Sequence, residues 1–448
     1  MKKLIQTLKN IWSIEELRGK ILFTLMMIAV YRVGTHIVLP GIDPAELKAG
    51  DNSNGILGLI DAFSGGAFNQ ASIFALGIMP YISASIFMQL MTVLVPRFQK
   101  MQKEGDSGRK KINQYTRYLT VAVTVLQASA YVTYLRGMTA QTGGMMPNFP
   151  ASSFWLTTVV VLTAGTLFVM WMGEKITDKG LGNGTSLIIM IGIVARLPQN
   201  FLQELSTKSV RSGDILVFIV EIAILIAIIM GCILLIQGVR KVPVNYAKQI
   251  VGNRHFGGGG ARQFLPLKVN SAGVMPIIFA QAIIFIPTIF SNFSTTGKTG
   301  ILKALTDQTN IWYMLIYSIV VIGFTFLYTA LIFNPKQIAD NLKQNNGFIP
   351  GVKPGQPTTD YIGNIMDNIT FPGAVLLAFV GILPGIAQRF GVTDQFSTFF
   401  GGTSLLIMVG VVLDTLQQIE TQLLMRQYDG LMKSGRIQGR QTTSAVQM

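Results

Sequence analysis

The sequence predicts an all-α polytopic membrane protein with ten membrane-spanning helices. Half of its 448 residues are hydrophobic and 13% are charged, a composition typical of proteins that cross a bilayer several times. Ten apolar stretches approach the roughly 20 residues that a bilayer core requires. The Lys and Arg residues are grouped in short blocks between these stretches, as expected where basic loops stay on one side of a membrane.

The ten predicted spans differ in how continuous their apolar stretch is. The span at 214–237 is the strongest, and those at 73–95, 184–203 and 271–290 are the weakest, because Gly, Pro or polar residues interrupt them. In chain order, the ten predicted spans lie at 21–39, 73–95, 118–135, 153–173, 184–203, 214–237, 271–290, 312–333, 368–388 and 400–423.

An even number of spans places both termini on the same side of the membrane. On this layout 27 of the 36 Lys and Arg residues lie on the side that holds the termini. That excess predicts that both termini are cytoplasmic and that the protein is a multi-pass protein of the cytoplasmic membrane. Residues 1–20 are polar and amphipathic, which predicts a cytoplasmic helix rather than a cleavable signal.

The composition argues against enzymes and metal proteins. Cys232 is the one cysteine, and His36 and His255 are far apart in the sequence, so neither a disulfide framework nor a zinc site is expected. The sequence contains no Walker loop, nucleophile elbow or H-E-x-x-H motif. We therefore expect no enzymatic activity, no cofactor and no metal. Basic blocks between apolar runs do not form a nucleic-acid face, so no sequence-specific nucleic-acid binding is expected.

The stretch DAFSGGAFNQASIFALGIMPYISASIFMQLMTVLV at 61–95 predicts a pathway through the membrane. Its first half is glycine-rich and too weakly apolar to span. Its second half is long enough to span, but it carries Gly77, Pro80, Ser83, Ser85 and Gln89. Backbone of this kind is tolerated at membrane depth where protein covers it or where it lines a water-filled cavity. We expect a short re-entrant element folded into the mouth of a pathway.

Three cytoplasmic loops have appreciable length, at 96–117, 238–270 and 334–367. The last contains four prolines and several glycines. Since proline fixes φ and removes a donor, this loop is expected to be a shaped turn structure. Such a loop suits docking of a protein, although the general positive charge of cytoplasmic loops explains the basic residues equally well.

Isoleucines recur at helical spacing in two of the weaker spans. Ile82 and Ile86 share one helical face, as do Ile189 and Ile193. Ordinary helix packing or lipid contact explains such a pattern. The sharper hypothesis is a hydrophobic constriction, in which apolar side chains exclude water and block ions.

Polar residues inside the spans leave further alternatives open. Glu221 lies roughly 10 Å into its span and either snorkels or pairs with a neighbouring helix. Asp414 and Gln281 lie deeper. Broken helices and buried carboxylates are compatible with a secondary transporter of a small solute, but two carboxylates are few for a coupled transporter. A structural scaffold for other membrane subunits is a third interpretation.

The block FSGGAFNQASIFALGIMPYISASIFMQLMTV at 63–93 strongly resembles the SecY family, the central subunits of the Sec protein-conducting channel. Other blocks resemble the same family in order and spacing, so the resemblance covers nearly the whole chain. They lie at 104–120, 173–189, 265–280, 334–357 and 400–414. The resemblance implies a channel that translocates secretory polypeptides and releases membrane proteins sideways into the bilayer, and it outweighs the transporter and scaffold hypotheses.

The resemblance also implies an architecture. The ten helices would form two inverted five-helix halves around a central pore, at 1–205 and 206–430, followed by a cytoplasmic tail at 431–448. The family's plug would fall at about 61–74, where the re-entrant element is expected. The plug residues would be Asp61, Phe63, Ser64, Gly65, Gly66, Phe68 and Asn69.

Three further sets of residues follow from the resemblance. The pore ring would comprise Ile82, Ile86, Ile189, Ile193, Ile278 and Ile407. The lateral gate would open between spans two and three on one side and seven and eight on the other, with candidates Ser85, Phe87, Gln89, Gln281 and Ile286. The docking residues for a motor or ribosome would be Arg254 and Lys353.

The resemblance implies partners that supply what the chain lacks. They are SecE-like and SecG-like small membrane subunits, the SecA motor ATPase, the ribosome, and substrates with signal sequences. Without a nucleotide-binding motif, the driving energy would come from a partner or from the proton-motive force.

Two features depart from the family. Lys353 replaces the usual arginine and loses its planar fork, and the loop 249–263, with four glycines at 257–260, is slightly longer and expected to be flexible at its tip.

Overall fold

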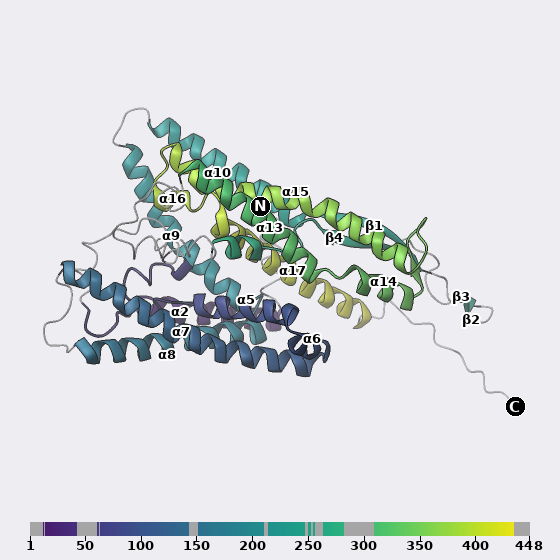
Figure 1. Cartoon of the computed structure of the whole chain (residues 1–448), viewed down its shortest axis with the longest axis horizontal. Helices are drawn as coiled ribbons and strands as arrows, with labels where there is room; N and C mark the ends of the chain where they lie inside the picture. Colours follow the sequence, from purple (N-terminus) through teal and green to yellow (C-terminus); the bar gives the residue numbers. More distant parts are fainter. Residues whose placement is uncertain are drawn as a thin grey trace.

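Two layers of helices make up the protein, and a slanted helix joins them (Figure 1). The computed structural model describes residues 12, 14–42, 61, 63–142, 151–209, 214–246, 250–251, 254–255, 263–281 and 309–433. The first layer consists of α2 (Glu15–Gly34), α5 (Met79–Leu94), α7 (Asp106–Thr142) and α8 (Ala151–Lys179). The second consists of α10 (Asp214–Gln237), α13 (Ile311–Ile332), α15 (Gln356–Arg389) and α17 (Gly402–Lys433).

The joining helix is α9 (Gly184–Ser209), which packs on α8 in the first layer and on α10 and α17 in the second. The short α16 (Asp394–Ser397) also contacts α9. The expected division of the chain at 205/206 falls within the last turn of α9, so one continuous helix carries residues of both expected halves.

The helices confirm an all-α polytopic membrane protein. Among the described residues, seven helices are long and apolar enough to cross a membrane, or eight if one bent pair is counted as a span. α10 is the most apolar of them, and most of its large apolar side chains are exposed, as suits a helix that faces lipid. The predicted first span corresponds to α2. Of the predicted span at 271–290, residues 275–281 are helical and the part beyond 281 lies outside the described residues.

The predicted span at 73–95 is wrong at its start. α5 begins at Met79 because residues 73–78 form turns, with Gly77 at φ +52°. Its 16 residues are about 24 Å long, less than the roughly 30 Å of a bilayer core. A bend of 99° then leads into α6 (Pro96–Lys103). The predicted loop at 96–117 is therefore helical for most of its length, because α6 and the first turns of α7 occupy it.

The second predicted cytoplasmic loop, 238–270, contains β-strands that the sequence analysis missed. β1 (Val239–Tyr246) pairs antiparallel with β4 (Gln263–Lys268), and β2 (Ile250–Val251) pairs with β3 (Arg254–His255). Within β1 the alternate residues Val242 and Val244 are buried, which is the period of a strand with one covered face.

The third loop, 334–367, is ordered as predicted, but by regular elements as well as turns. α14 (Pro335–Gln344) is capped by the Asn334 side chain, and β5 (Gly347–Phe348) extends the sheet through β1. The predicted span at 368–388 lies within α15, which starts earlier, at Gln356.

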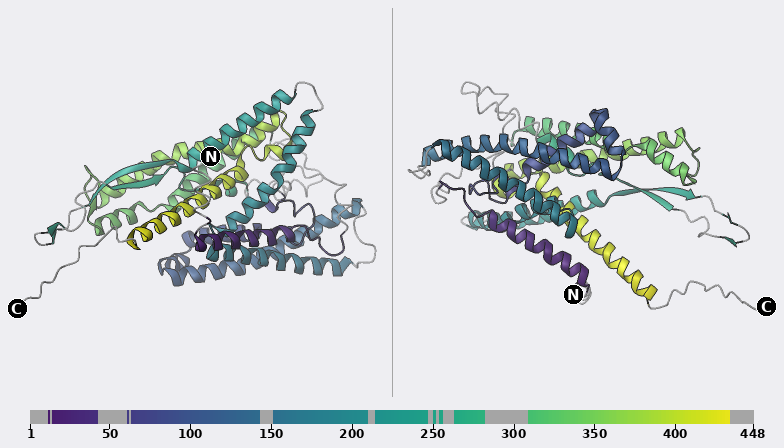
Figure 2. Two further views of the ribbon diagram at one scale, coloured as in Figure 1. Left: turned by 180° about the vertical axis from the view of Figure 1, so that it is seen from behind. Right: turned by 90° about the horizontal axis from the view of Figure 1, so that it is seen from below.

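We call β1, β4, β5, α14 and the first turns of α15 the hairpin module. It has an apolar core of its own, made by Val242, Val244, Leu267, Leu342, Ile349, Ile362 and Met366. The module projects from one end of the helical layers, and the C-terminal end of α17 extends toward that same end (Figures 1 and 2).

Candidate functional site

The segment at 61–78 lies between α2 and α5. Asp61, Phe63 and Ser64 are helical, and the residues from 65 to 78 form turns with one bridge between Ser72 and Val38. Backbone hydrogen bonds attach it to the residues that follow α2: the Leu39 N–H donates to the Ala71 carbonyl at 2.8 Å, and the Ile73 N–H donates to the Ile37 carbonyl at 2.9 Å. The segment is therefore folded back against the first layer, as the sequence predicted for a re-entrant element.

This segment touches the backbone of α9 directly. A Cβ atom on Gly192 of α9 would lie 2.5 Å from the Phe63 carbonyl oxygen. A Cβ atom on Gly65 would lie 2.9 Å from the Gly192 Cα, and Gly65 also has φ +66°. Side chains at these two positions would force the chains apart, so glycine at both permits the close contact.

Side chains within the segment fix its shape. The Asp61 Oδ1 accepts from the Asn69 N–H at 2.9 Å. The Ser64 hydroxyl accepts from the Phe68 N–H at 3.1 Å and donates to the Asp61 carbonyl at 3.1 Å. Asp61 and Ser64 are buried, so these bonds satisfy polar groups that are shielded from water.

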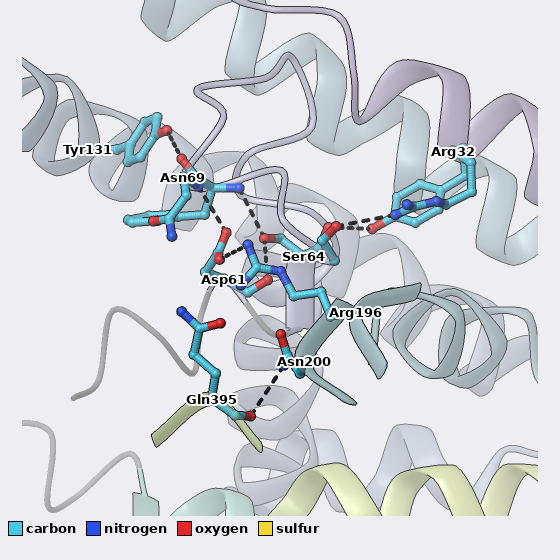
Figure 3. Close-up of polar contacts among 11 residues, drawn as sticks. Arg32, Asp61, Ser64, Asn69, Tyr131, Arg196, Asn200 and Gln395 are labelled. Atoms are coloured by element: carbon cyan, nitrogen blue, oxygen red, sulfur yellow. Dashed lines mark hydrogen bonds and ion pairs between the residues drawn. The ribbon is translucent and has the colours of Figure 1, made fainter. Parts of the chain in front are cut away.

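Polar side chains of α2 hold the segment from one side (Figure 3). The Arg32 guanidinium donates to the Gly65 carbonyl at 3.2 Å, and the Tyr31 hydroxyl donates to the Ser64 carbonyl at 3.4 Å. Both acceptors are neutral carbonyls, so these contacts position the backbone without requiring a charged partner in the segment.

Helices α7 and α9 hold it from two further sides. The Tyr131 hydroxyl of α7 donates to the Phe68 carbonyl at 2.6 Å. The Arg196 guanidinium of α9 forms an ion pair with the Asp61 carboxylate. Three helices thus converge on one short segment (Figure 3), and the sequence analysis identified neither Tyr131 nor Arg196.

The predicted ring isoleucines lie in two adjoining apolar clusters. Ile189, Ile193 and Ile407 are buried in one cluster, and Ile82 packs against it. Phe74 of the 61–78 segment belongs to the same cluster, and Phe63 packs against it. The structure therefore brings four of the six predicted residues together beside the re-entrant segment.

The remaining two ring candidates lie in the neighbouring cluster. Ile86 is buried there, and Ile278 packs against it. Ile82 contacts both clusters, so it links the two groups of isoleucines.

One predicted gate residue, Gln89, lies where α5 meets α13. The Gln89 Oε1 of α5 accepts from the Tyr328 hydroxyl of α13 at 2.6 Å. The ring of Phe279 stacks on Phe324 with centroids 5.5 Å apart, and it also contacts Tyr328. At this place a neutral hydrogen bond joins α5 to α13, and aromatic stacking joins the helical residues 275–281 to α13. We call this place the gate side.

The other gate candidates are distributed around this contact. Ser85 is half-buried, and Phe87 is 48% exposed. Gln281 accepts a hydrogen bond from the Thr403 hydroxyl of α17 at 3.3 Å. Ile286 lies outside the described residues.

A buried charged cluster lies where α9 leads into α10, away from the gate side. The Lys208 Nζ is 2.8 Å from the Glu221 Oε1 and 3.7 Å from the Glu204 Oε1. The Thr393 backbone N–H donates to the Glu204 Oε2 at 3.1 Å, and the Thr393 hydroxyl also bonds to that oxygen. Glu221 therefore pairs with the neighbouring helix, which is one of its two predicted alternatives. We call this cluster the hinge side.

The docking candidates both lie in projecting parts of the chain. Arg254 is in β3, beyond the hairpin module, and Lys353 is exposed in the turn that precedes α15. The Lys353 carbonyl accepts from the Thr358 hydroxyl at 2.9 Å, which ties this turn to the first turn of the helix. Asp414, expected deep in the last span, is exposed on α17.

Arg196 had a signal in the sequence. It follows Ile189 and Ile193 by seven and three residues, which places all three on one face of α9. A charged residue that shares a face with apolar residues inside a span is a candidate functional residue. Tyr328 carried no comparable signal, because its partner Gln89 is distant in the sequence and only the fold brings them together.

Comparison with known proteins identifies the relatives of this chain. The profile of the SecY family matches residues 72–416. A protein translocase subunit SecY from Streptomyces galbus is 41% identical over 430 residues, which cover 93% of this chain and 97% of that protein.

Solved structures share the fold at much lower sequence identity. One, described as the structure of a protein conducting channel, has a TM-score of 0.62 and 15% identity, and the match covers 95% of each chain. Another is Sec61 in a canine ribosome-channel complex from the endoplasmic reticulum, with a TM-score of 0.56 and 14% identity over 95% of each chain.

Proposed function

The chain belongs to the SecY family, and on that premise we propose that secretory polypeptides cross the membrane between its two helical layers, beside the segment at 61–78. It is a multi-pass membrane protein and a channel subunit of a protein translocase, and it is not itself an enzyme. The small-solute transporter considered from the sequence receives no support from these relatives.

The observation that carries the proposed path is the convergence of isoleucines beside a re-entrant segment. Ile82, Ile189 and Ile407 come from three different helices and meet in one apolar cluster, which Phe63 and Phe74 of the segment also contact. Apolar side chains offer ions no substitute for hydration water, so such a constriction is a barrier to ions. The segment at 61–74 would act as a plug, and together with the isoleucines it would seal the resting channel.

The gate side supports a second, lateral exit. There the hydrogen bond between Gln89 and Tyr328 holds α5 to α13, and aromatic contacts hold Phe279 to α13. None of these contacts is an ion pair. A segment of about 20 apolar residues gains free energy by entering lipid. Such a segment would leave the channel sideways between these helices, whereas polar segments would continue across the membrane.

The hairpin module is proposed to dock the machinery that drives transport. The module projects from one end of the molecule, Lys353 is exposed in the turn that precedes α15, and a ribosome-bound Sec61 channel shares the fold. The ribosome and a SecA-like motor are proposed to bind this end. SecE-like and SecG-like subunits would lie against the lipid-facing helices.

The location of the termini is part of the same proposal. The C-terminal end of α17 extends toward the end that carries the hairpin module. If this end binds the ribosome and motor, it faces the cytoplasm. Both termini are then cytoplasmic, and the protein lies in the cytoplasmic membrane.

Site-specific photocrosslinking tests the proposed path. A photoreactive residue at position 278 should crosslink a secretory chain stalled midway, and the crosslink should require a functional signal sequence. Position 226 on α10, where Ile226 is 57% exposed toward the surroundings, is the matched control and should not crosslink the chain. Absence of crosslinks from 278, 82 and 407 would show that the polypeptide does not pass these isoleucines.

A further inference from the structure

We propose that the ion pair between Arg196 and Asp61 is an electrostatic latch that holds the segment at 61–74 in its resting position. Arg196 is then a positioning residue of the channel, and displacement of the segment requires separation of this pair. This inference rests on the proposed function, because a latch has a role only if the segment moves when a polypeptide enters.

The carboxylate of Asp61 takes part both in the ion pair with Arg196 and in a hydrogen bond within the segment. Its side chain is 0% exposed, and that of Arg196 is 21% exposed. The same carboxylate accepts from the Asn69 N–H at 2.9 Å. One charged group therefore binds α9 and also closes the turn at 61–69, so that the turn and the contact with α9 depend on each other.

The guanidinium of Arg196 also lies against the backbone of the segment. A Cβ atom on Gly66 would be 3.2 Å from the Arg196 Nη2 and 3.3 Å from its Nε. Gly66 has φ +95°, so its backbone leaves this face open for the guanidinium. Arg196 thus contacts both the charge and the main chain of the segment (Figure 3).

The latch is connected to the proposed ion barrier through α9. Ile193 lies one helical turn before Arg196 on the same face, and it is buried in the apolar cluster that Phe63 and Phe74 contact. When Arg196 releases Asp61, the phenylalanines lose the anchor that keeps them against the isoleucines. Opening the latch therefore also weakens the seal.

The physical chemistry of a buried pair makes this latch reversible. Desolvation of both charges offsets much of their attraction, so an ion pair that becomes hydrated on separation costs little net free energy to open. Removal of one partner is different, because the other charge is left buried and uncompensated in the closed state. The latch consequently depends on opposite charges at the two positions, in contrast to the contact of Arg32 with the neutral Gly65 carbonyl.

Charge reversal and its repair provide the test. The channel is reconstituted with its partner subunits in a planar bilayer without substrate, and the resting ion conductance is measured. Arg196→Glu and Asp61→Arg should each raise this conductance about tenfold or more, because each places like charges together in the closed state. The double variant should restore it to within about twofold of the original value, because the opposite charges are paired again.

Two further variants keep the result interpretable. Asp61→Asn is nearly isosteric, removes the charge and should also raise the conductance, even if the reversals impair folding. Arg117→Ala is the matched control, since Arg117 forms an exposed bidentate pair with Glu174, in which its Nη2 lies 2.7 Å from the Glu174 Oε2. It should leave the conductance unchanged.

Two outcomes would overturn the latch. Unchanged conductance in Asp61→Asn and in both reversals would show that the pair does not hold the segment. A double variant that leaks as much as the two reversals combined would show general disruption in place of a charge-specific contact. These outcomes are separate from failure of the proposed function, which would appear as loss of the crosslink from position 278 in the unmodified channel.

Discussion

The hinge side joins α9 to the second helical layer and the gate side joins the first layer to the second, and the two contacts differ in their chemistry. At the hinge side, Glu204, Lys208 and Glu221 are all buried, and Thr393 adds two hydrogen bonds to Glu204. At the gate side, Gln89 and Tyr328 share a hydrogen bond between neutral groups beside stacked aromatic rings. One contact depends on full charges, and the other depends on neutral and apolar groups.

This difference indicates which side separates when the channel opens. Separating a buried charged network at a place that stays closed to water leaves its charges uncompensated and is strongly unfavourable. Breaking a neutral hydrogen bond costs about 0.5–1.5 kcal/mol net, and aromatic contacts can re-form with lipid or with an apolar substrate segment. We therefore expect the gate side to open while the hinge side stays intact and serves as the pivot.

The largest effect is expected at the hinge side. Lys208→Met would leave the Glu204 and Glu221 carboxylates together without their shared ammonium group. We expect a loss of about 3–5 kcal/mol in the free energy of unfolding, measured by denaturant titration of the detergent-solubilised protein. Lys20→Met is the matched control, because Lys20 pairs with the exposed Glu16 and such pairs contribute about 0.2–1 kcal/mol. Equal effects of the two variants would contradict the assignment of the hinge side.

An intermediate effect on the stability of the closed channel is expected in the apolar cluster that contains Ile407. Ile407→Asn places an amide in the apolar cluster that contains Ile189 and Ile193, which should destabilise the closed channel by about 1–3 kcal/mol. We expect export of substrates with defective signal sequences to increase, as measured in cells or vesicles. Ile407→Val keeps the site apolar and should have little effect. Unchanged stringency and unchanged ion leak in Ile407→Asn would contradict a role of this residue in the seal.

A smaller effect is expected at the gate side. Tyr328→Phe removes the hydroxyl that donates to Gln89 and keeps the aromatic ring. The loss of about 1 kcal/mol favours the open gate by roughly fivefold, so weakly hydrophobic signals should be inserted more readily. The readout is the signal hydrophobicity at which half of the substrate is inserted. If that threshold rises or does not move, the hydrogen bond does not hold the gate closed.

The smallest effect on stability is expected in the projecting parts. Arg254→Glu combined with Lys353→Glu should change the free energy of unfolding by less than about 0.5 kcal/mol, because β3 lies beyond the hairpin module and Lys353 is exposed. Binding to a SecA-like motor and to ribosomes should nevertheless weaken, as measured by co-sedimentation. Full retention of both interactions would place docking elsewhere on the chain.

Much of the architecture could be predicted because it depends on patterns local to the sequence. The apolar stretch at 214–237 coincides with α10, and glycine and polar residues marked the re-entrant segment before α5. The start of α5 at Met79 was missed because residues 73–78 are apolar enough for a span. Their turns depend on contacts with the end of α2. The pairing of β1 with β4 was missed because antiparallel partners are far apart in the chain.

Some features of the candidate site could likewise be predicted from the sequence, and others could not. The sequence by itself determined that the chain crosses the membrane several times and which stretch folds back against the helices, because hydropathy and glycine content act locally. It identified Asp61 as a plug candidate through the family resemblance, and Ile193 as a constriction candidate through both the isoleucine spacing and that resemblance. The tertiary structure alone decided that Asp61 pairs with Arg196 and that Lys208 lies between two glutamates. The physical reason is that a pairing energy depends on the distance between charges and on their exclusion from water, and both are set by the packing of helices that the sequence does not place side by side.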